Sequence, residues 1–98
     1  MEVTQSQAQE IAQAALEAKI QAAAKLRDFT FGPAKLVNDH PPCWTFAVHS
    51  EQMWEAGYAP AALFVYIDKQ DGHVWAVAEQ NDYFYAHEKQ AQHQPIAA

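Results

Sequence analysis

The stretch that most constrains this chain is 61–79, AALFVYIDKQDGHVWAVAE. It holds two segments rich in β-branched and aromatic residues, joined by a polar link that ends in Gly72. Glycine readily takes the positive φ that a tight turn requires, so the stretch predicts a β-hairpin. If Asp68 faces His73, the register of that hairpin is fixed. The expected pairs are Ile67 with Val74, Tyr66 with Trp75, Val65 with Ala76, Phe64 with Val77 and Leu63 with Ala78.

Side chains alternate across a strand, so this hairpin has two unlike faces. One face is aliphatic and small, with Leu63, Val65, Ile67, Val74, Ala76 and Ala78. The other is mostly aromatic, with Phe64, Tyr66, Trp75 and Val77, and we expect Trp44 and Phe46 of the preceding strand to join it. A small domain hides one sheet face easily, so the functional question is what covers the aromatic face.

The segment from Thr4 to about Arg27 predicts one long helix. Thr4 with Gln7 matches the capping-box pattern, and no glycine or proline interrupts the helix formers that follow. One stripe at helical spacing holds Ala8, Ala12, Ala15, Leu16, Ile20, Ala23 and Leu26. Because this stripe is mostly alanine, we expect the helix to lie close against the aliphatic face. Lys19 also falls on the stripe and must extend to an edge.

The remaining segments complete an α+β pattern. Strands are predicted at 34–38 and 43–50, before the two of the hairpin, and a short C-terminal helix or arm is predicted at 81–90 with a cap at Asn81 or Asp82. The expected fold is a four-stranded antiparallel meander with the N-terminal helix on one face, a cystatin-like two-layer sandwich. Residues 1–90 form a single domain in this interpretation, and 91–98 form a frayed tail.

Charge is unevenly distributed along the 98 residues, whose net charge is −6. The first 37 residues carry four acidic and four basic side chains, whereas 38–88 carry eight acidic side chains against Lys69 alone. An acidic half disfavours nucleic acid as a ligand and favours a partner protein with a basic surface. The alternative is that the acidity only keeps the protein soluble.

Catalytic and metal-binding patterns are weak. Cys43, the single cysteine, excludes an internal disulfide and fits a reducing cytosol. His40 and His49 are not placed to activate it, so a buried structural thiol is expected. His73 with Asp68 and Asp71 predicts a polar closure of the turn rather than a metal site, and no cofactor is expected. The N-terminus lacks the pattern of a secretory signal, and no stretch predicts a membrane span.

Two aromatic features have alternative interpretations. Trp54 and Tyr58 either cap the core or form an exposed patch beside the Glu51–Glu55 pair. The aromatic face is covered either by the C-terminal segment, with Tyr83, Phe84 and Tyr85, or by another protein, since large apolar patches mark interfaces.

Four short motifs in the second half of the chain resemble those of a known family. The series Trp44-x-Phe46, Gly57-x-Ala59-Pro60, Ile67-Asp68-Lys69-x-Asp71-Gly72-x-Val74 and Asp82-Tyr83 resembles the small bacterial proteins grouped as immunity protein 35. It covers about residues 43–88, and Tyr58 stands where the family usually has asparagine. The resemblance implies a leading helix, a meander, and a role in binding a cognate antibacterial toxin and blocking it in the producing cell. It does not imply the toxin's chemistry.

The sequence therefore predicts a cytoplasmic immunity protein, not an enzyme, that occludes a basic effector toxin. The expected partner contacts are Glu51, Trp54, Glu55, Tyr58, Asp68, Asp71, Trp75, Glu79, Asp82 and Tyr85. The alternative is a small structural or chaperone-like protein that self-associates as a homodimer through the aromatic face.

Overall fold

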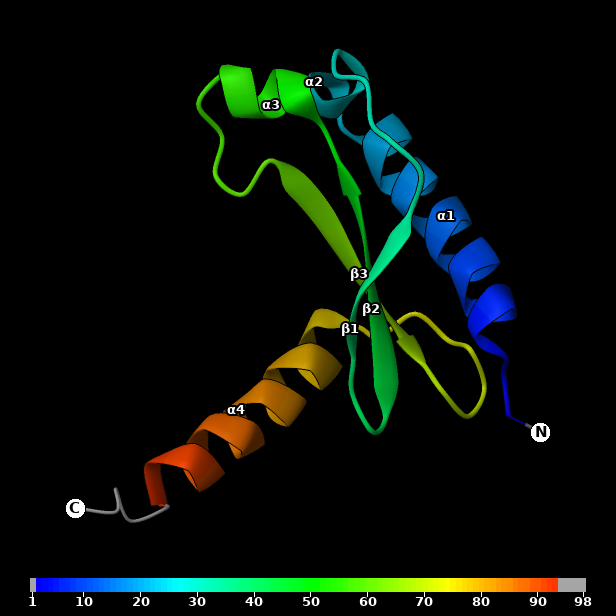
Figure 1. Ribbon diagram of the computed structural model, residues 1–98, viewed down its shortest axis with the longest axis vertical. Helices are drawn as coiled ribbons and strands as arrows, with labels where there is room; N and C mark the ends of the chain where they lie inside the picture. The colour runs from blue at the N-terminus through cyan, green and yellow to red at the C-terminus, as the bar shows by residue number, and fades with distance from the viewer. Residues whose placement is uncertain (1, 94–98) are drawn as a thin grey trace.

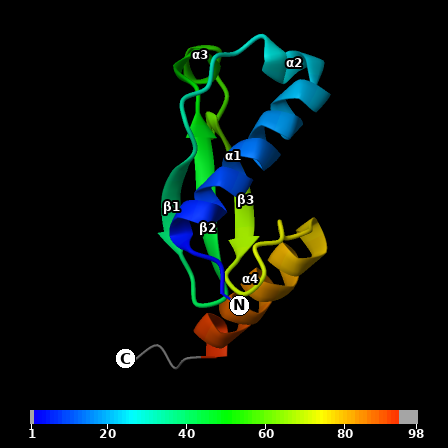
Figure 2. The same cartoon turned by 90° about the vertical axis from the view of Figure 1, so that its right-hand side faces the viewer.

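The computed structural model describes residues 2–93, with side chains described as far as residue 86. In chain order the elements are α1 (Gln5–Ala22), α2 (Ala24–Arg27), β1 (Lys35–Asp39), β2 (Cys43–His49), α3 (Glu51–Glu55), β3 (Ala62–Asp68) and α4 (Val77–His93). The strands of this range form one antiparallel sheet in the order β1-β2-β3, and α1 lies across one of its faces (Figures 1 and 2). The predicted α+β class with a leading helix is confirmed.

Helix α1 begins as its sequence predicts. Thr4 is the N-cap, its side chain accepts a hydrogen bond from Gln7 N, and the Gln7 side chain accepts one from Thr4 N in return. The predicted single helix is interrupted at Ala23, which is extended (φ −117°, ψ 114°) before α2 resumes. Nothing in the local sequence accounts for this break.

The stripe of small residues on α1 faces the sheet. Ala8, Ala12 and Leu16 are completely buried there. Lys19, at the edge of the stripe, extends its ammonium to the carbonyl oxygen of Phe64 at 3.3 Å. Since the alanines carry almost no side-chain bulk, the helix axis can approach the strands closely, and the core forms in this single interface.

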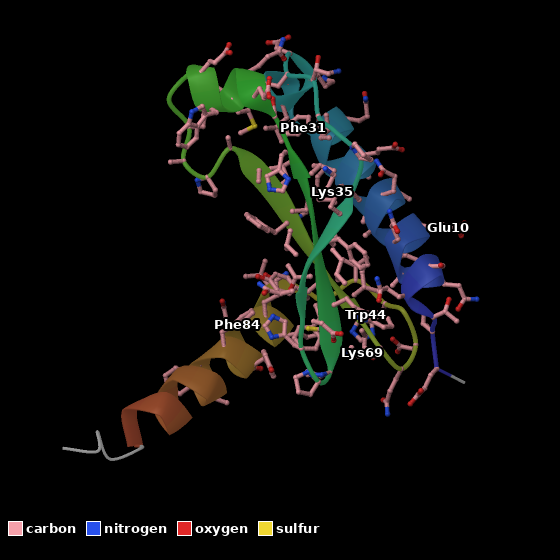
Figure 3. All side chains as sticks on the ribbon, viewed as in Figure 1. Glu10, Phe31, Lys35, Trp44, Lys69 and Phe84 are labelled. Atoms are coloured by element: carbon pink, nitrogen blue, oxygen red, sulfur yellow. The ribbon has the colours of Figure 1, made fainter. Side chains whose placement is uncertain are left out.

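Register between β2 and β3 decides which side chains join that core. Trp44 pairs with Ile67, and Phe46 with Val65, so both aromatic residues lie on the face that α1 covers. The expectation that Trp44 and Phe46 join Tyr66 on the other face is wrong, because residues directly opposite each other in a sheet share a face. Figure 3 shows Trp44 on the side of α1 and Phe84 on the opposite side.

The predicted fourth strand does not form in the described chain. The turn after β3 has the expected register at its start: Asp68 N donates to His73 O at 3.0 Å, and Trp75 N donates to Tyr66 O at 2.8 Å. The single bridge there joins Ile67 to Val74, after which the chain leaves the sheet. The predicted pairs of Ala76, Val77 and Ala78 with β3 are therefore wrong.

Residues 76–79 start a helix instead of continuing the strand. The Glu79 side chain accepts a hydrogen bond from Ala76 N at 2.9 Å, which is the returning half of a capping box. Helix α4 thus starts at Val77, four residues before the predicted 81–90 helix, and Asn81 and Asp82 are not its cap. It runs to His93, and the rest of the predicted tail, 94–98, lies outside the described residues.

Helix α4 leaves the sheet on the side opposite α1 and points away from the body (Figure 1). The radius of gyration is 15.5 Å, against about 13 Å expected for a compact domain of this length. Within the side chains described, Gln80, Tyr83 and Phe84 in the first two turns of α4 contact the rest of the chain.

Candidate functional site

The ten predicted partner contacts separate into two groups at opposite ends of β3. One group, here called the α3 patch, consists of Glu51, Trp54, Glu55 and Tyr58. The other, here called the turn–α4 group, consists of Asp68, Asp71, Trp75, Glu79, Asp82 and Tyr85. Strand β3 lies between them, and its seven residues span about 20 Å. The structure does not bring the ten residues into one cluster.

Three contacts anchor the short helix of the α3 patch. The Ser50 side chain caps α3 by accepting a hydrogen bond from Met53 N at 3.3 Å. Met53 itself is buried, and the Gln52 amide oxygen accepts a hydrogen bond from Thr30 N at 2.6 Å. The helix is therefore fastened both to the core and to the segment that precedes β1.

The aromatic residues of the α3 patch face solvent. Trp54 is 70% exposed and Tyr58 is 44% exposed, so the exposed alternative holds rather than the core-capping one. The Tyr58 ring packs edge-on against Phe29 with centroids 5.7 Å apart. One side of the tyrosine is thereby fixed while its other side stays accessible. A surface hollow lies beside the two rings, lined in part by Gly57 and Ala59.

The patch also carries two carboxylates. Glu51 and Glu55 are exposed and lie one helical turn apart on α3. Within residues 2–86, neither carboxylate makes an ion pair. Their charge is therefore available to a basic group from outside, next to a tryptophan.

The turn–α4 group is built differently, around a buried tryptophan. Trp75 is only 8% exposed, and its indole N–H donates to Asp68 Oδ2 at 3.0 Å. Tyr66 stacks beside it with centroids 6.4 Å apart, and Tyr83 from α4 contacts it edge-on at 5.7 Å. Trp75 is thus an internal anchor for α4 and offers little surface to a partner.

Helix α4 provides the cover over this end of the aromatic face. Phe84 contacts Tyr66 edge-on at 5.5 Å and also packs against the His40 ring at 5.7 Å. Tyr83 and Phe84 therefore occupy the surface that self-association through Tyr66 and Trp75 would need. Phe64, nearer to α3, remains 38% exposed.

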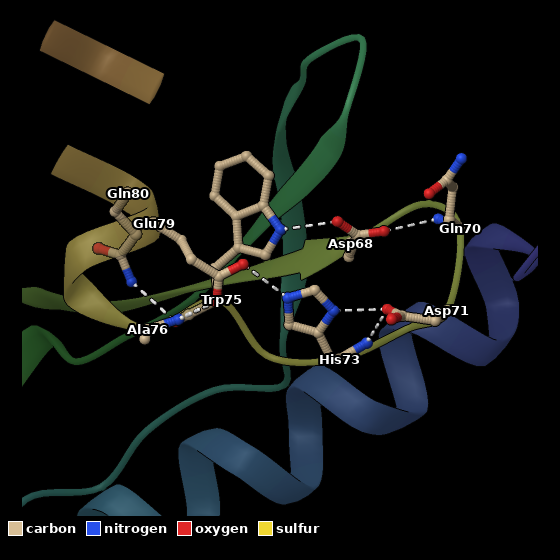
Figure 4. A network of polar contacts seen from close by, with 8 residues as sticks. All are labelled: Asp68, Gln70, Asp71, His73, Trp75, Ala76, Glu79 and Gln80. Carbon is tan, nitrogen blue, oxygen red and sulfur yellow. Dashed lines mark hydrogen bonds and ion pairs between the residues drawn. The ribbon is translucent and has the colours of Figure 1, made fainter. Parts of the chain in front are cut away.

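A polar network centred on His73 joins the turn to α4 (Figure 4). His73 Nδ1 lies 2.5 Å from Asp71 Oδ1, and His73 Nε2 lies 2.8 Å from Glu79 Oε2. These hydrogen bonds to Glu79 and Asp71 raise the pKa of His73 above its ordinary value. The backbone N–H and then the ring of His73 lower the pKa of Asp71, and Ala76 N and then the His73 ring lower that of Glu79.

Three side chains of this network have metal-ligand chemistry. Ligand-type atoms of Asp68, Asp71 and His73 all lie within 4.8 Å of one another. Each is already engaged in a protein hydrogen bond: both ring nitrogens of His73 face carboxylates, and Asp68 accepts from Trp75 and from Gln70 N. The contact of the His73 ring with Asp71 is a polar closure of the turn of the kind that the sequence predicted.

Cys43 has the environment of a structural thiol. It is completely buried, and burial, with the nearby Asp68 charge, raises its pKa to about 11. His40 is close along the chain, and the two residues exchange backbone hydrogen bonds across Pro41 and Pro42. The His40 ring packs against Tyr83 and Phe84 on α4. A thiol with so high a pKa is not an activated nucleophile.

No family model, curated protein or solved structure matches this chain. In the described part of the chain, neither α1 nor α4 combines the length and the apolar character that crossing a bilayer demands.

Glu79 has a double role that sequence reasoning missed. It accepts from Ala76 N at the start of α4 and from the His73 ring of the turn, through different carboxylate oxygens. The spacing of Ala76 and Glu79, with a good helix-forming sequence after them, was the available signal. The β-branched residues Val74 and Val77 obscured it by favouring a strand.

Proposed function

We propose that this protein is a binding module that occludes a basic partner protein through the α3 patch. The observation that carries the proposal is the 70% exposure of Trp54 on a helix that is capped, anchored by buried Met53 and hydrogen-bonded to Thr30. Tryptophan and tyrosine dominate the energetics of protein interfaces. A side chain presented on a fixed helix also loses less conformational entropy on binding.

The charges around Trp54 suggest the chemistry of the partner. Glu51 and Glu55 flank the exposed rings, and the chain from residue 38 to 88 is strongly acidic. Such a field accelerates encounter with a basic surface and disfavours an acidic one. A complex that buries the two rings and pairs both carboxylates would cover the partner's basic surface.

The biological role that we propose is immunity: a cytoplasmic protein that neutralises a cognate antibacterial toxin in the producing cell. The resemblance to immunity protein 35 supports this role, and so does the exposed Trp54 on its anchored helix. We also propose that the helix on an antiparallel sheet is a reduced cystatin-like arrangement.

Calorimetry with the product of the neighbouring toxin gene tests the proposal. Trp54→Ala should weaken binding by about 30-fold or more, the scale of an interface hot spot. Reversing both carboxylates, Glu51→Lys with Glu55→Lys, should slow association and reduce its salt dependence. The matched control makes the same charge change on the exposed side of α1, with Glu10→Lys and Glu17→Lys, and should leave affinity nearly unchanged.

Circular dichroism of each variant shows whether weaker binding results from a lost contact or from a loss of folding.

Tyr85→Ala, on the exposed side of α4, tests whether the turn–α4 group also contacts the partner. The proposal fails if the neighbouring toxin does not bind, or if Trp54→Ala and the double reversal both bind and protect cells as the wild type does.

A further inference from the structure

The imidazole of His73 is the only side chain within residues 2–86 that joins two carboxylates from different elements by ion pairs. Asp71 belongs to the turn after β3, and Glu79 belongs to the first turn of α4. An imidazole can donate to both at once only as the imidazolium, because the neutral ring has a single N–H. With both carboxylates ionised, the two contacts are hydrogen bonds at the same time only when each ring nitrogen carries a proton.

We propose that the His73 imidazolium is a pH-sensitive latch that fastens the start of α4 to the β3 turn, and that loss of its second proton loosens α4. This inference stands apart from the proposed binding function. It concerns how the helix is held, whichever surface meets a partner.

Loss of the proton has a defined consequence at Glu79. The neutral ring keeps one donor, so either Asp71 or Glu79 faces a lone pair and loses its hydrogen bond. The positive charge between the two carboxylates is lost as well, and their repulsion is no longer offset. Because Glu79 also accepts from Ala76 N, a displaced Glu79 side chain weakens the N-terminal cap of α4.

The charged groups that face His73 all favour its protonated form. They are Asp71 in the turn and Glu79 on α4. Asp68, at the end of β3, acts on Glu79 instead and opposes the ionisation of that carboxyl. On the α1 side the turn is packed against apolar groups, since Val3 and Ile11 approach Gly72. Because the folded pKa lies above the ordinary value, the latch is complete below that value and is lost as pH rises through the folded pKa.

Other contacts of α4 do not depend on this proton. Tyr83 and Phe84 pack against Trp75, Tyr66 and His40, and Gln80 Nε2 donates to Trp75 O at 3.2 Å. Deprotonation therefore loosens the first turn without detaching the helix. The His40 ring also contacts α4, so the experiment must distinguish the two histidines.

The test measures hydrogen-exchange protection of α4 amides 80–85 by NMR at pH 6 and pH 9, corrected for intrinsic rates. In the wild type, the protection of these amides should fall about two- to five-fold from pH 6 to pH 9, which is the effect expected of exposed ion pairs. His73→Gln should show the lower protection at both pH values. Glu79→Gln should bring the pKa of His73, followed by its ring resonances, back toward the ordinary value.

His49→Gln is the matched control, because His49 is exposed at the far end of β2 and should leave the wild-type behaviour unchanged. Equal wild-type protection at both pH values would overturn the latch. So would a His73→Gln variant that keeps the wild-type pH dependence, which would assign the effect to His40. All the substituted side chains are exposed, so the variants are expected to fold.

Discussion

The indole N–H of Trp75 donates to the carboxylate of Asp68 at 3.0 Å, across the turn that ends the sheet. Asp68 also accepts a hydrogen bond from Gln70 N at 2.8 Å. Partial burial opposes ionisation of Asp68, but the hydrogen bonds from Trp75 and Gln70 outweigh it and hold the pKa below its ordinary value. The turn, the strand end and the anchor of α4 are thus joined by one carboxylate.

Removing this donor should destabilise the fold in a pH-dependent way. Trp75→Phe keeps most of the buried ring but lacks the N–H, and we expect a loss of about 1–2 kcal/mol in unfolding free energy at pH 7. The depressed pKa contributes stability above the ordinary value of Asp68 that is lost as pH falls through the folded pKa. The difference from wild type should therefore shrink in acid, as followed by urea unfolding with circular dichroism.

Trp54→Phe is the control for this substitution. It makes the same chemical change on a side chain that is 70% exposed and should alter stability by less than about 0.5 kcal/mol. An equal loss for Trp75→Phe at pH 7 and at a pH low enough to protonate Asp68 in the folded wild type would show that packing rather than the hydrogen bond to Asp68 carries the effect.

A side chain at Gly72 should destabilise the fold. Its φ is +76°, and a Cβ there would lie 3.0 Å from both Ile11 Cδ1 and Val3 Cγ2. Gly72→Ala combines an unfavourable backbone conformation with tight contacts that the Ile11 and Val3 side chains must move to relieve, and we expect a loss of about 2–4 kcal/mol in thermal or urea unfolding.

Gly57→Ala separates the two causes at Gly72. Gly57 also has a positive φ, +94°, but nothing lies within 4 Å of a Cβ added there. Backbone strain alone should cost about 1–2 kcal/mol. If the two variants lose the same stability, close packing around Gly72 contributes nothing.

Local signals in the sequence predicted the parts of the fold that depend on neighbouring residues. The Thr4–Gln7 capping box, the buried Ala8–Leu16 stripe and the first pair of the turn, Ile67 with Val74, are confirmed. Each is decided within a few positions of the chain, by cap hydrogen bonding, helical spacing or turn geometry.

Two of the errors came from choices that depend on distant residues, and the error at the fourth strand came from a local signal that was overlooked. The face that Trp44 and Phe46 take depends on the register of β2 against β3 across a 12-residue connection, and a one-residue slip reverses every side chain. The fourth strand does not form because the hydrogen bond from Ala76 N to Glu79 caps α4 and competes with strand pairing to β3. The division of the candidate site into two groups also depends on distant residues. Spacing in the sequence did not show that α4 covers Trp75.

The alanine stripe of α1 leads to a packing prediction. Ala12 is completely buried against the sheet, so Ala12→Leu should force the helix away from the strands and cost about 1–3 kcal/mol. Ala18 is on the exposed side of the same helix, and Ala18→Leu should change stability by less than about 0.5 kcal/mol. Urea unfolding of the two variants measures the difference. Equal stabilities would mean that α1 does not depend on close approach.

The Cys43 thiol should be nearly inert in the folded protein. With a pKa of about 11 instead of 9.0, the thiolate fraction at pH 8 falls about 100-fold, and complete burial adds a steric barrier. Reaction with a disulfide reagent should therefore be slow in buffer and fast in denaturant. The folded rate should rise in variants that loosen α4, because α4 packs over the neighbouring His40 and Tyr66 rings. Rapid labelling of the native wild type at neutral pH would contradict the structural role of Cys43 and reopen the possibility of thiol chemistry.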